Sequence, residues 1–248
     1  MLILHVIQAR YGDSLILEYG APSAPRFLLV DGGPNDVYDR HLKPMLEEIR
    51  DDGGELDLVV LSHVDRDHVT GLLDLTHDLQ WQRVREIPET ISVNELWHNS
   101  FSRAMENDLQ DRLSRVLDRA GPVRSSLIRS SEISRDIAQG DELTRAADNL
   151  GVPMNPRERF GPERIITVDQ ASEPIVLDNL TLRIVGPTEA SLEELEEEWL
   201  EWLEQQEDRV LVPNLQEAER AARSLDSSVP NLSSIMFLAE ADGRTILM

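Results

Sequence analysis

The stretch "LSHVDRDHVTGL", Leu61 to Leu72, places two histidines and two aspartates within six positions. The first of these residues ends an apolar run, "LDLVVLSH" (56–63), which is typical of a buried strand. The chain has no cysteine, so His, Asp and Glu are the side chains available to hold a divalent metal ion. The pattern therefore predicts a metal site where a strand passes into a helix.

Working outward from this stretch, the N-terminal third predicts strands and one helix. The apolar runs at 2–7, 14–19 and 26–31 are separated by turn-rich segments and predict strands. A helix is expected at about 38–51, with Leu42, Met45, Leu46 and Ile49 on one face. This order of strands and helices favours an α/β fold in which helices are layered on a sheet.

The remaining two thirds change character twice. Residues 101–150 are polar, Arg-rich and helical in pattern, with breaks expected at Gly121-Pro122 and Gly140. After them we expect a loop at 153–164, strands at 164–168 and 180–185, and a polar connector at 208–232. The chain closes on "SSIMFLAEADGRTILM", which predicts two strands around an Asp-Gly turn.

One acidic helix is expected between these strands and the connector. In "GPTEASLEELEEEWLEWLEQQ" the apolar residues recur at helical spacing, and the glutamates between them are interpreted as a solvated face. The predicted buried stripe consists of Leu192, Leu195, Trp199 and Trp202.

Composition excludes several classes of function. The net charge of −23 repels phosphate backbones, so no extended nucleic-acid-binding surface is expected. No run reaches the ~20 apolar residues of a membrane helix, and the N-terminus lacks the basic leader of a signal peptide. Together with the absence of cysteine, these features predict a cytoplasmic protein.

The residues of the quoted stretch suggest two metal ions. His63 and Asp65 lie two apart at the end of an extended run, so we expect their side chains to project to the same side. Asp67 and His68 follow where the backbone turns into a helix. Four such ligands can face two ions, which would activate a bridging water for hydrolysis. The alternative is that these are helix-capping aspartates beside two incidental histidines, and Asp67 by itself suits a cap.

These residues resemble a known family. "SHVDRDHVTG" resembles the metal-binding signature of the metallo-β-lactamase-fold hydrolases, usually His-any-His-any-Asp-His. "LLVDGGP" resembles the family's early strand and Asp-Gly-Gly loop, and "RYGDSLILEY" resembles the branch related to competence-type DNA-uptake proteins. The resemblance implies an αββα sandwich over a single domain, 1–248, with a helical insertion at 101–150.

The resemblance also implies roles for individual residues. His63 and Asp65 would bind one metal ion and Asp67 and His68 the other, with Asp67 also orienting the water or accepting its proton. His98, at the end of another expected strand, would join the first ion; the alternative is a rim histidine beside Trp97. Asp13 and Asp31 are expected to accept hydrogen bonds from the ligand histidines and so to orient them; ordinary turn chemistry is the alternative for both aspartates.

One position departs from the family's signature. Asp65 stands where the second histidine is usual, a replacement typical of the competence-related branch and its nuclease or phosphodiesterase chemistry. A carboxylate in place of an imidazole makes a site harder and more anionic. The two divalent ions are therefore expected to be Zn²⁺ or Mn²⁺, with Mg²⁺ also possible.

Three functions remain open at this point. The first is hydrolysis of a phosphodiester by a metal-activated water, and the second is hydrolysis of a lactone, amide or thioester on the same fold. The third is a binding or regulatory module with an incomplete metal site, in which Arg112, Arg115, Arg119 and Arg124 of the helical region dock a partner or form a lid. A solvated helical cover is the alternative for those arginines.

The C-terminus carries a separate expectation. In the family, a strand like "GRTILM" is followed by an aspartate that bridges both metals and later by a last histidine. This sequence ends at Met248, before such residues, and no histidine follows His98. The sequence therefore predicts a fold truncated at its C-terminus, completed by a further segment or a companion chain, with weak metal binding on its own.

Overall fold

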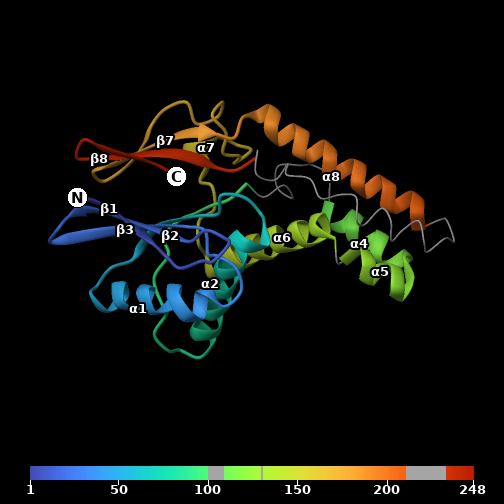
Figure 1. Cartoon of the computed structure of the whole chain (residues 1–248), viewed down its shortest axis with the longest axis horizontal. Coiled ribbons are helices and arrows are strands. Elements are labelled where there is room, and N and C mark those ends of the chain that lie inside the picture. The colour runs from blue at the N-terminus through green and yellow to red at the C-terminus, as the bar shows by residue number, and fades with distance from the viewer. Residues whose placement is uncertain (100–108, 130, 211–232) are drawn as a thin grey trace.

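Two β-sheets pack face to face in the computed structural model of this chain, and helices cover the outer face of the first sheet (Figure 1). The description covers residues 1–99, 109–129, 131–210 and 233–248. The five strands of the first sheet lie side by side in chain order: β1 (Leu2–Val6), β2 (Leu15–Ala21), β3 (Ala24–Val30), β4 (Leu56–Val60) and β5 (Leu96–Trp97). The α/β class and the two-sheet sandwich are as the sequence predicted.

The first sheet changes direction at β3. β1, β2 and β3 form an antiparallel meander, whereas β3, β4 and β5 run parallel. The crossover from β3 to β4 passes through a π-helical segment, η1 (Tyr38–Leu42), and then α1 (Lys43–Asp51). Because parallel strands end at the same edge of a sheet, the segments after β3, β4 and β5 come together there, which is where ligands bind in open α/β sheets.

The outer face of the first sheet is covered by α1, α2 (Arg66–Val84) and α6 (Glu132–Leu150). Their apolar residues form one core with the side chains on that face of the sheet, including Leu29, Leu46 and Leu72. Burial of such side chains stabilises the fold by roughly 1.5–3 kcal/mol each. This core fixes the start of α2 against the ends of β3 and β4.

The second sheet is antiparallel and packs on the inner face of the first. Its strands are β6 (Ile175–Leu177), β7 (Leu180–Gly186), β8 (Met236–Ala241) and β9 (Arg244–Leu247). Side chains from both sheets, among them Leu17, Trp97 and Phe237, fill the space between them. The predicted Asp-Gly turn joins β8 to β9, with both Asp242 and Gly243 in the left-handed conformation.

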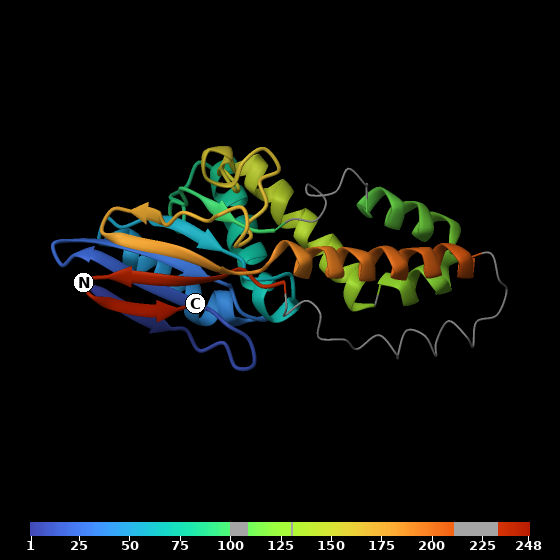
Figure 2. The same ribbon diagram turned by 90° about the horizontal axis from the view of Figure 1, so that it is seen from above.

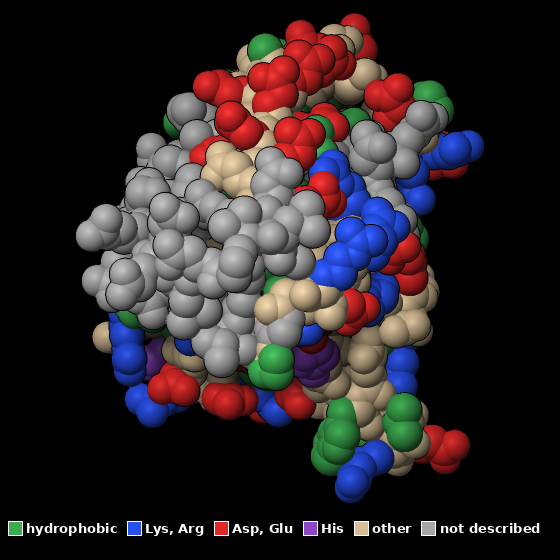
Figure 3. Space-filling model, turned by 90° about the vertical axis from the view of Figure 1, so that its right-hand side faces the viewer, with side chains coloured by type: hydrophobic (Ala, Val, Ile, Leu, Met, Phe, Trp, Pro, Cys, Tyr) green, Lys and Arg blue, Asp and Glu red, His purple; other side chains and the backbone are tan. Residues whose placement is uncertain are grey.

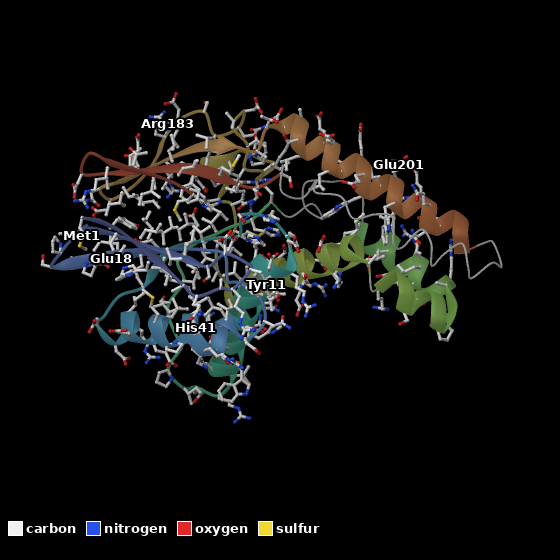
Figure 4. The ribbon with its side chains drawn as sticks, in the orientation of Figure 1. Met1, Tyr11, Glu18, His41, Arg183 and Glu201 are labelled. Carbon is white, nitrogen blue, oxygen red and sulfur yellow. The ribbon has the colours of Figure 1, made fainter. Side chains whose placement is uncertain are left out.

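A helical arm extends from the end of the sandwich (Figure 2). Its members are α4 (Leu109–Arg119), α5 (Gly121–Arg129), the first turns of α6, and α8 (Glu189–Val210), which share a third apolar cluster. The predicted stripe of α8 is confirmed, because Leu192, Leu195, Trp199 and Trp202 are all buried. Glutamates of the opposite face, such as Glu201, are exposed (Figure 4).

Several predicted boundaries were wrong. The strand predicted at 164–168 is absent, because the side-chain amide of Asn99 pairs with both backbone groups of Ile166 and takes the place of a neighbouring strand. The loop predicted at 153–164 contains a short helix, α7 (Arg157–Phe160). Residues 101–108 and 130 of the predicted insertion and 211–232 of the predicted connector lie outside the described residues.

The break predicted at Gly140 is also wrong. Gly140 lies inside α6, where the missing side chain lets the helix approach Val64 and His98; an added Cβ would lie 3.3 Å and 3.4 Å from their nearest atoms. The break predicted at Gly121-Pro122 is confirmed as the junction of α4 and α5. None of the described helices is both long and apolar enough to cross a bilayer.

Candidate metal centre

The quoted histidines and aspartates lie on a tight turn between β4 and α2. β4 ends at Val60, earlier than the predicted 56–63, and the backbone N–H of Asp65 donates to the carbonyl of His63 at 3.1 Å. His63 and Asp65 therefore do not occupy alternate positions of a strand, and the strand-based reason for placing them on one side was wrong. The cap of α2 is Asp65, not Asp67: its Oδ1 accepts from the backbone N–H of Arg66 at 2.6 Å.

The two histidines of the turn are in contact. The ring centroids of His63 and His68 lie 4.2 Å apart with a tilt of 48°. His63 is buried, and its Nδ1 lies 3.1 Å from the hydroxyls of both Ser62 and Ser234. Because Ser62 donates its own proton to Asp31, it accepts from His63, and this arrangement places the lone pair of His63 on Nε2.

Asp31 organises this cluster from the end of β3. Its carboxylate accepts three hydrogen bonds, from the Ser62 N–H at 2.8 Å, the Ser62 hydroxyl at 2.7 Å and His68 Nδ1 at 2.8 Å. Asp31 is buried and has a left-handed backbone with φ 58°, a strained conformation that is uncommon outside glycine. Since His68 donates through Nδ1, its lone pair is also on Nε2.

The predicted hydrogen bond between Asp31 and a histidine is thus present, with Asp31 accepting from His68. That this histidine binds a metal ion stays a prediction. Asp13 differs. It is exposed, and among the described residues it makes no hydrogen bond to either histidine. Its charge nevertheless acts on His68, as the following shifts show.

The two histidines titrate in opposite directions. Burial, reinforced by the neighbouring His68, lowers the pKa of His63. For His68 burial is the largest influence and also favours the neutral ring, but the Asp31 hydrogen bond and the charges of Asp31, Asp67 and Asp13 together outweigh it and raise the pKa. His63 is therefore the ring that stays neutral most readily, as a metal-binding imidazole must.

Asp67 sits on the first turn of α2 beside His68. Its Oδ1 lies 3.8 Å from His68 Nε2, and its side chain is half-buried, with 26% of its surface exposed. A carboxylate at this distance from a ring nitrogen lone pair can share a cation with it. Asp67 and His68 are thus brought together as predicted.

His98 is brought to the same region from the end of β5. It is buried rather than at a rim, and its backbone is held by Asn155, which accepts from the His98 N–H at 2.9 Å and donates to its carbonyl at 2.7 Å. The His98 and His63 side chains line one small cavity of about 10 Å³, close to the space that a single water needs. Leu195 and Trp199 of α8 close the cavity from above.

The sequence did not point to Ser234, Asn155 or the α8 side chains as parts of this region. The hydroxyl of Ser234 reaches His63 from a position 171 residues later in the chain. No local motif marks such residues, because only the packing of the second sheet and the arm brings them to the turn. Ser62 was within the quoted stretch, and its hydrogen-bonding side chain next to His63 was an available signal.

The side chains at the turn are of the chemical types that bind divalent cations, but their arrangement fits an ion less well. The Nε2 of His63 is buried and has no hydrogen-bond partner within the described residues, and the Nε2 of His68 faces Asp67. Over the same residues, however, no three His, Asp or Glu side chains converge on one point. The candidate donors for an ion are therefore the Nε2 atoms of His63 and His68 and the carboxylate of Asp67, while Asp65 has its Oδ1 engaged in the helix cap.

A first prediction concerns Asp31. The substitution Asp31→Asn keeps the shape but removes the charge, so an amide faces donors that a carboxylate now satisfies. We expect metal affinity to fall by about 10- to 100-fold, the usual effect of losing a carboxylate behind a histidine ligand. Isothermal titration with Mn²⁺ and Zn²⁺ measures it, with Asp36→Asn, an exposed aspartate that also has a left-handed backbone, as the control. Equal affinities would contradict this role.

Comparison with known proteins places the chain in a family. A family model described as "Metallo-beta-lactamase superfamily" matches residues 26–151, about half of the chain, and this range includes the whole turn between β4 and α2 together with His98. No curated protein matches the chain. The parallel strands, the Asp31–His68 contact and the family match agree on one conclusion: the chain belongs to the metallo-beta-lactamase superfamily, whose members are in general metal-dependent hydrolases.

Proposed function

We propose that this protein hydrolyses a phosphodiester, using divalent ions bound at the turn between β4 and α2. The observation that carries the proposal is the contact between His63 and His68, whose Nε2 lone pairs are set by the hydrogen bonds of Ser62 and Asp31. Fixing the tautomer of two adjacent histidines from behind is the usual way in which proteins prepare imidazoles for a metal.

A divalent ion bound here would supply Lewis acidity and lower the pKa of a water molecule. The chain's own residues have separate tasks. Asp31 holds His68 in its orientation and keeps its Nδ1 protonated. Asp67, half-buried and 3.8 Å from His68 Nε2, would accept a proton at its carboxylate.

Two features support a phosphodiester as the substrate. Asp65 replaces the imidazole that the family's signature usually has, which favours the oxygen-rich, Mn²⁺- or Mg²⁺-tolerant chemistry of phosphate ester hydrolysis beside Zn²⁺. Arg66, on the first turn of α2 between Asp65 and Asp67, is exposed, and its side chain has no ion pair among the described residues. A cation at a helix N-terminus attracts an anionic group locally, in spite of the net negative charge.

A second candidate, hydrolysis of an uncharged lactone, amide or thioester, is favoured by a neighbouring cavity. This cavity has a volume of about 430 Å³, and Asn99 lies between it and the small cavity at His63 and His98. Glu163, Glu189, Glu193 and Glu196 line it, and Figure 3 shows acidic side chains gathered over α8. Such a wall repels a long polyanion, so any phosphodiester substrate should be small.

The third possibility, a module that binds a partner without turnover, rested on four arginines. Arg112 pairs with Glu207 of α8 at 3.2 Å and so contributes to the arm itself. Arg115 and Arg119 are exposed, and the side chain of Arg124 lies outside the description. A solvated cover explains the exposed pair, and a module without turnover is the alternative that the absence of any hydrolysis in the following assay would favour.

A substrate panel with metal removal tests the proposal. We expect the chelator-treated protein to be nearly inactive on bis(para-nitrophenyl) phosphate. Added Mn²⁺ or Zn²⁺ should raise the rate at least about 100-fold above that of the chelator-treated protein, because water activation depends on the ion. Para-nitrophenyl acetate and a lactam serve as the comparison substrates. Cleavage of these alone would favour the second candidate. No turnover of any substrate, at full metal occupancy measured by mass spectrometry, would contradict enzymatic function.

A further inference from the structure

The turn between β1 and β2 lies directly against the candidate metal centre. It is closed by hydrogen bonds from Ile7 N–H to the Ser14 carbonyl at 3.0 Å and from Gly12 N–H to the Ala9 carbonyl at 3.1 Å. Gly12 packs so closely on the first turn of α2 that an added Cβ would lie 2.0 Å from the backbone oxygen of Asp67. The turn is therefore a fixed wall of the site.

At the tip of this turn, Tyr11 presents an exposed aromatic ring. It is 73% exposed, and among the described residues its side chain makes no hydrogen bond and no ring contact. Of the described aromatic side chains, Trp81, at 49%, is the only other exposed one, and it lies under the guanidinium of Arg85. Figure 4 shows Tyr11 at the edge of the sandwich where α2 and α6 lie.

We propose that Tyr11 determines specificity by stacking on a planar ring carried by the substrate, an aryl or nucleobase-bearing phosphodiester rather than an alkyl one. The inference rests on the proposed function, and it adds a substrate class to it. Tyr11 directly precedes Gly12, whose backbone packs against Asp67, so the turn that carries the ring adjoins any group bound at Asp67. A phenol ring offers a large flat surface with little conformational freedom to lose.

The backbone of the turn supports the same placement. Arg10, the residue before Tyr11, has a left-handed backbone with φ 61°, a conformation that non-glycine residues rarely adopt outside fixed turns. Arg10 is exposed and adds a positive charge to the same turn. The turn thus offers a cation for a phosphate oxygen and a flat face for an attached ring, two elements that proteins also combine to bind the backbone and bases of single-stranded nucleic acid.

Binding and turnover are measured with ligands that differ only in the ring. Diphenyl and dimethyl phosphate serve as binding probes by nuclear magnetic resonance titration. The methyl and phenyl esters of para-nitrophenyl phosphate serve as substrates with the same leaving group. For Tyr11→Ala we expect the Kd of diphenyl phosphate and the KM of the phenyl ester to rise about tenfold, with no change in the Kd of dimethyl phosphate. The KM of the methyl ester, which keeps only the nitrophenyl ring of the leaving group, should rise less than that of the phenyl ester. Tyr11→Phe should retain wild-type values, because stacking needs the ring and not the hydroxyl.

Trp81→Ala is the matched control, since it removes an exposed ring from the far end of α2. It should change neither the Kd of diphenyl phosphate nor the KM of the phenyl ester. Equal values for Tyr11→Ala and wild type with diphenyl phosphate and the phenyl ester would overturn the inference, and so would an equal loss of affinity for diphenyl and dimethyl phosphate. If the wild type cleaves neither ester but Tyr11→Ala still weakens diphenyl phosphate binding selectively, the inference holds and the proposed hydrolysis fails. Failure of the two ideas is therefore distinguishable.

Discussion

Replacing His68 by alanine is expected to reduce kcat/KM for phosphodiester hydrolysis by about a thousandfold or more, which corresponds to at least ~4 kcal/mol of transition-state stabilisation. His68 presents its Nε2 toward Asp67, and Asp31 fixes that orientation from behind. Removing the ring deletes one of the two histidine nitrogens that could bind the metal ion. It also leaves the His63 ring without the His68 ring that it contacts. Steady-state kinetics with saturating Mn²⁺ and metal analysis measure the loss.

The substitution also has a structural cost that must be separated from the chemical one. Asp31 is buried and loses one of its three hydrogen-bond donors, which costs about 1–3 kcal/mol of stability. We therefore include His68→Gln, which keeps a polar side chain of similar length but binds metal poorly, and check both variants by circular dichroism and urea unfolding. The control is His41→Ala in η1, on the helical layer away from the turn (Figure 4), which should keep full activity.

Folded His68→Gln protein with wild-type kcat/KM would contradict a metal-binding role for this ring. A loss confined to stability, with kcat/KM preserved at low temperature, would make His68 a structural partner of Asp31 only. Metal occupancy separates the two results, because a ligand substitution lowers the bound metal per chain and a structural one does not.

The candidate site was predicted largely from one stretch because its members are neighbours in sequence. Asp67 and His68 share the first turn of α2, so the spacing alone places them together. The geometry within the stretch was predicted less well. The strand ends at Val60, and Asp65 is the helix cap, since capping depends on where the helix begins and not on composition.

The parts of the site that the sequence did not reveal are those supplied by tertiary packing. Ser234 reaches His63 from the second sheet, and Trp199 closes the cavity at His98 from α8. Gly140 was predicted to break a helix because glycine lowers helix propensity, but a close approach to His98 outweighs that cost. Asn99 likewise satisfies the backbone of Ile166, a bond that no pattern in 164–168 indicates.

The packing that holds Asp31 in place leads to the second large prediction. Gly71, in the interior of α2, lies against the backbone of Gly32 in the loop after β3. Its N–H donates to the carbonyl of Gly33 at 3.0 Å, and the N–H of Gly32 donates to the carbonyl of His68 at 2.8 Å. A Cβ on Gly71 would lie 2.0 Å from the Gly32 oxygen and 2.6 Å from its carbonyl carbon. Both are backbone atoms, so neither can rotate away.

For Gly71→Ala we expect a loss of about 2–3 kcal/mol in the free energy of unfolding, because overpacking outweighs the ~1 kcal/mol that alanine gains in an open helix. The loop after β3 has to shift, and it carries Asp31 with it, so activity should fall about ten- to a hundredfold even in the folded fraction. Urea unfolding followed by circular dichroism gives the first quantity, and kinetics below the unfolding transition give the second.

Gly140→Ala is the matched control, since it places the same methyl group in the interior of another helix. There the nearest atoms are side-chain atoms of Val64 and His98 at 3.3 Å and 3.4 Å, which can move by a few tenths of an ångström. We expect its unfolding free energy to stay within about 1 kcal/mol of wild type. If Gly71→Ala were equally well tolerated, the backbone contact between α2 and the loop after β3 would not be what holds Asp31 against His68.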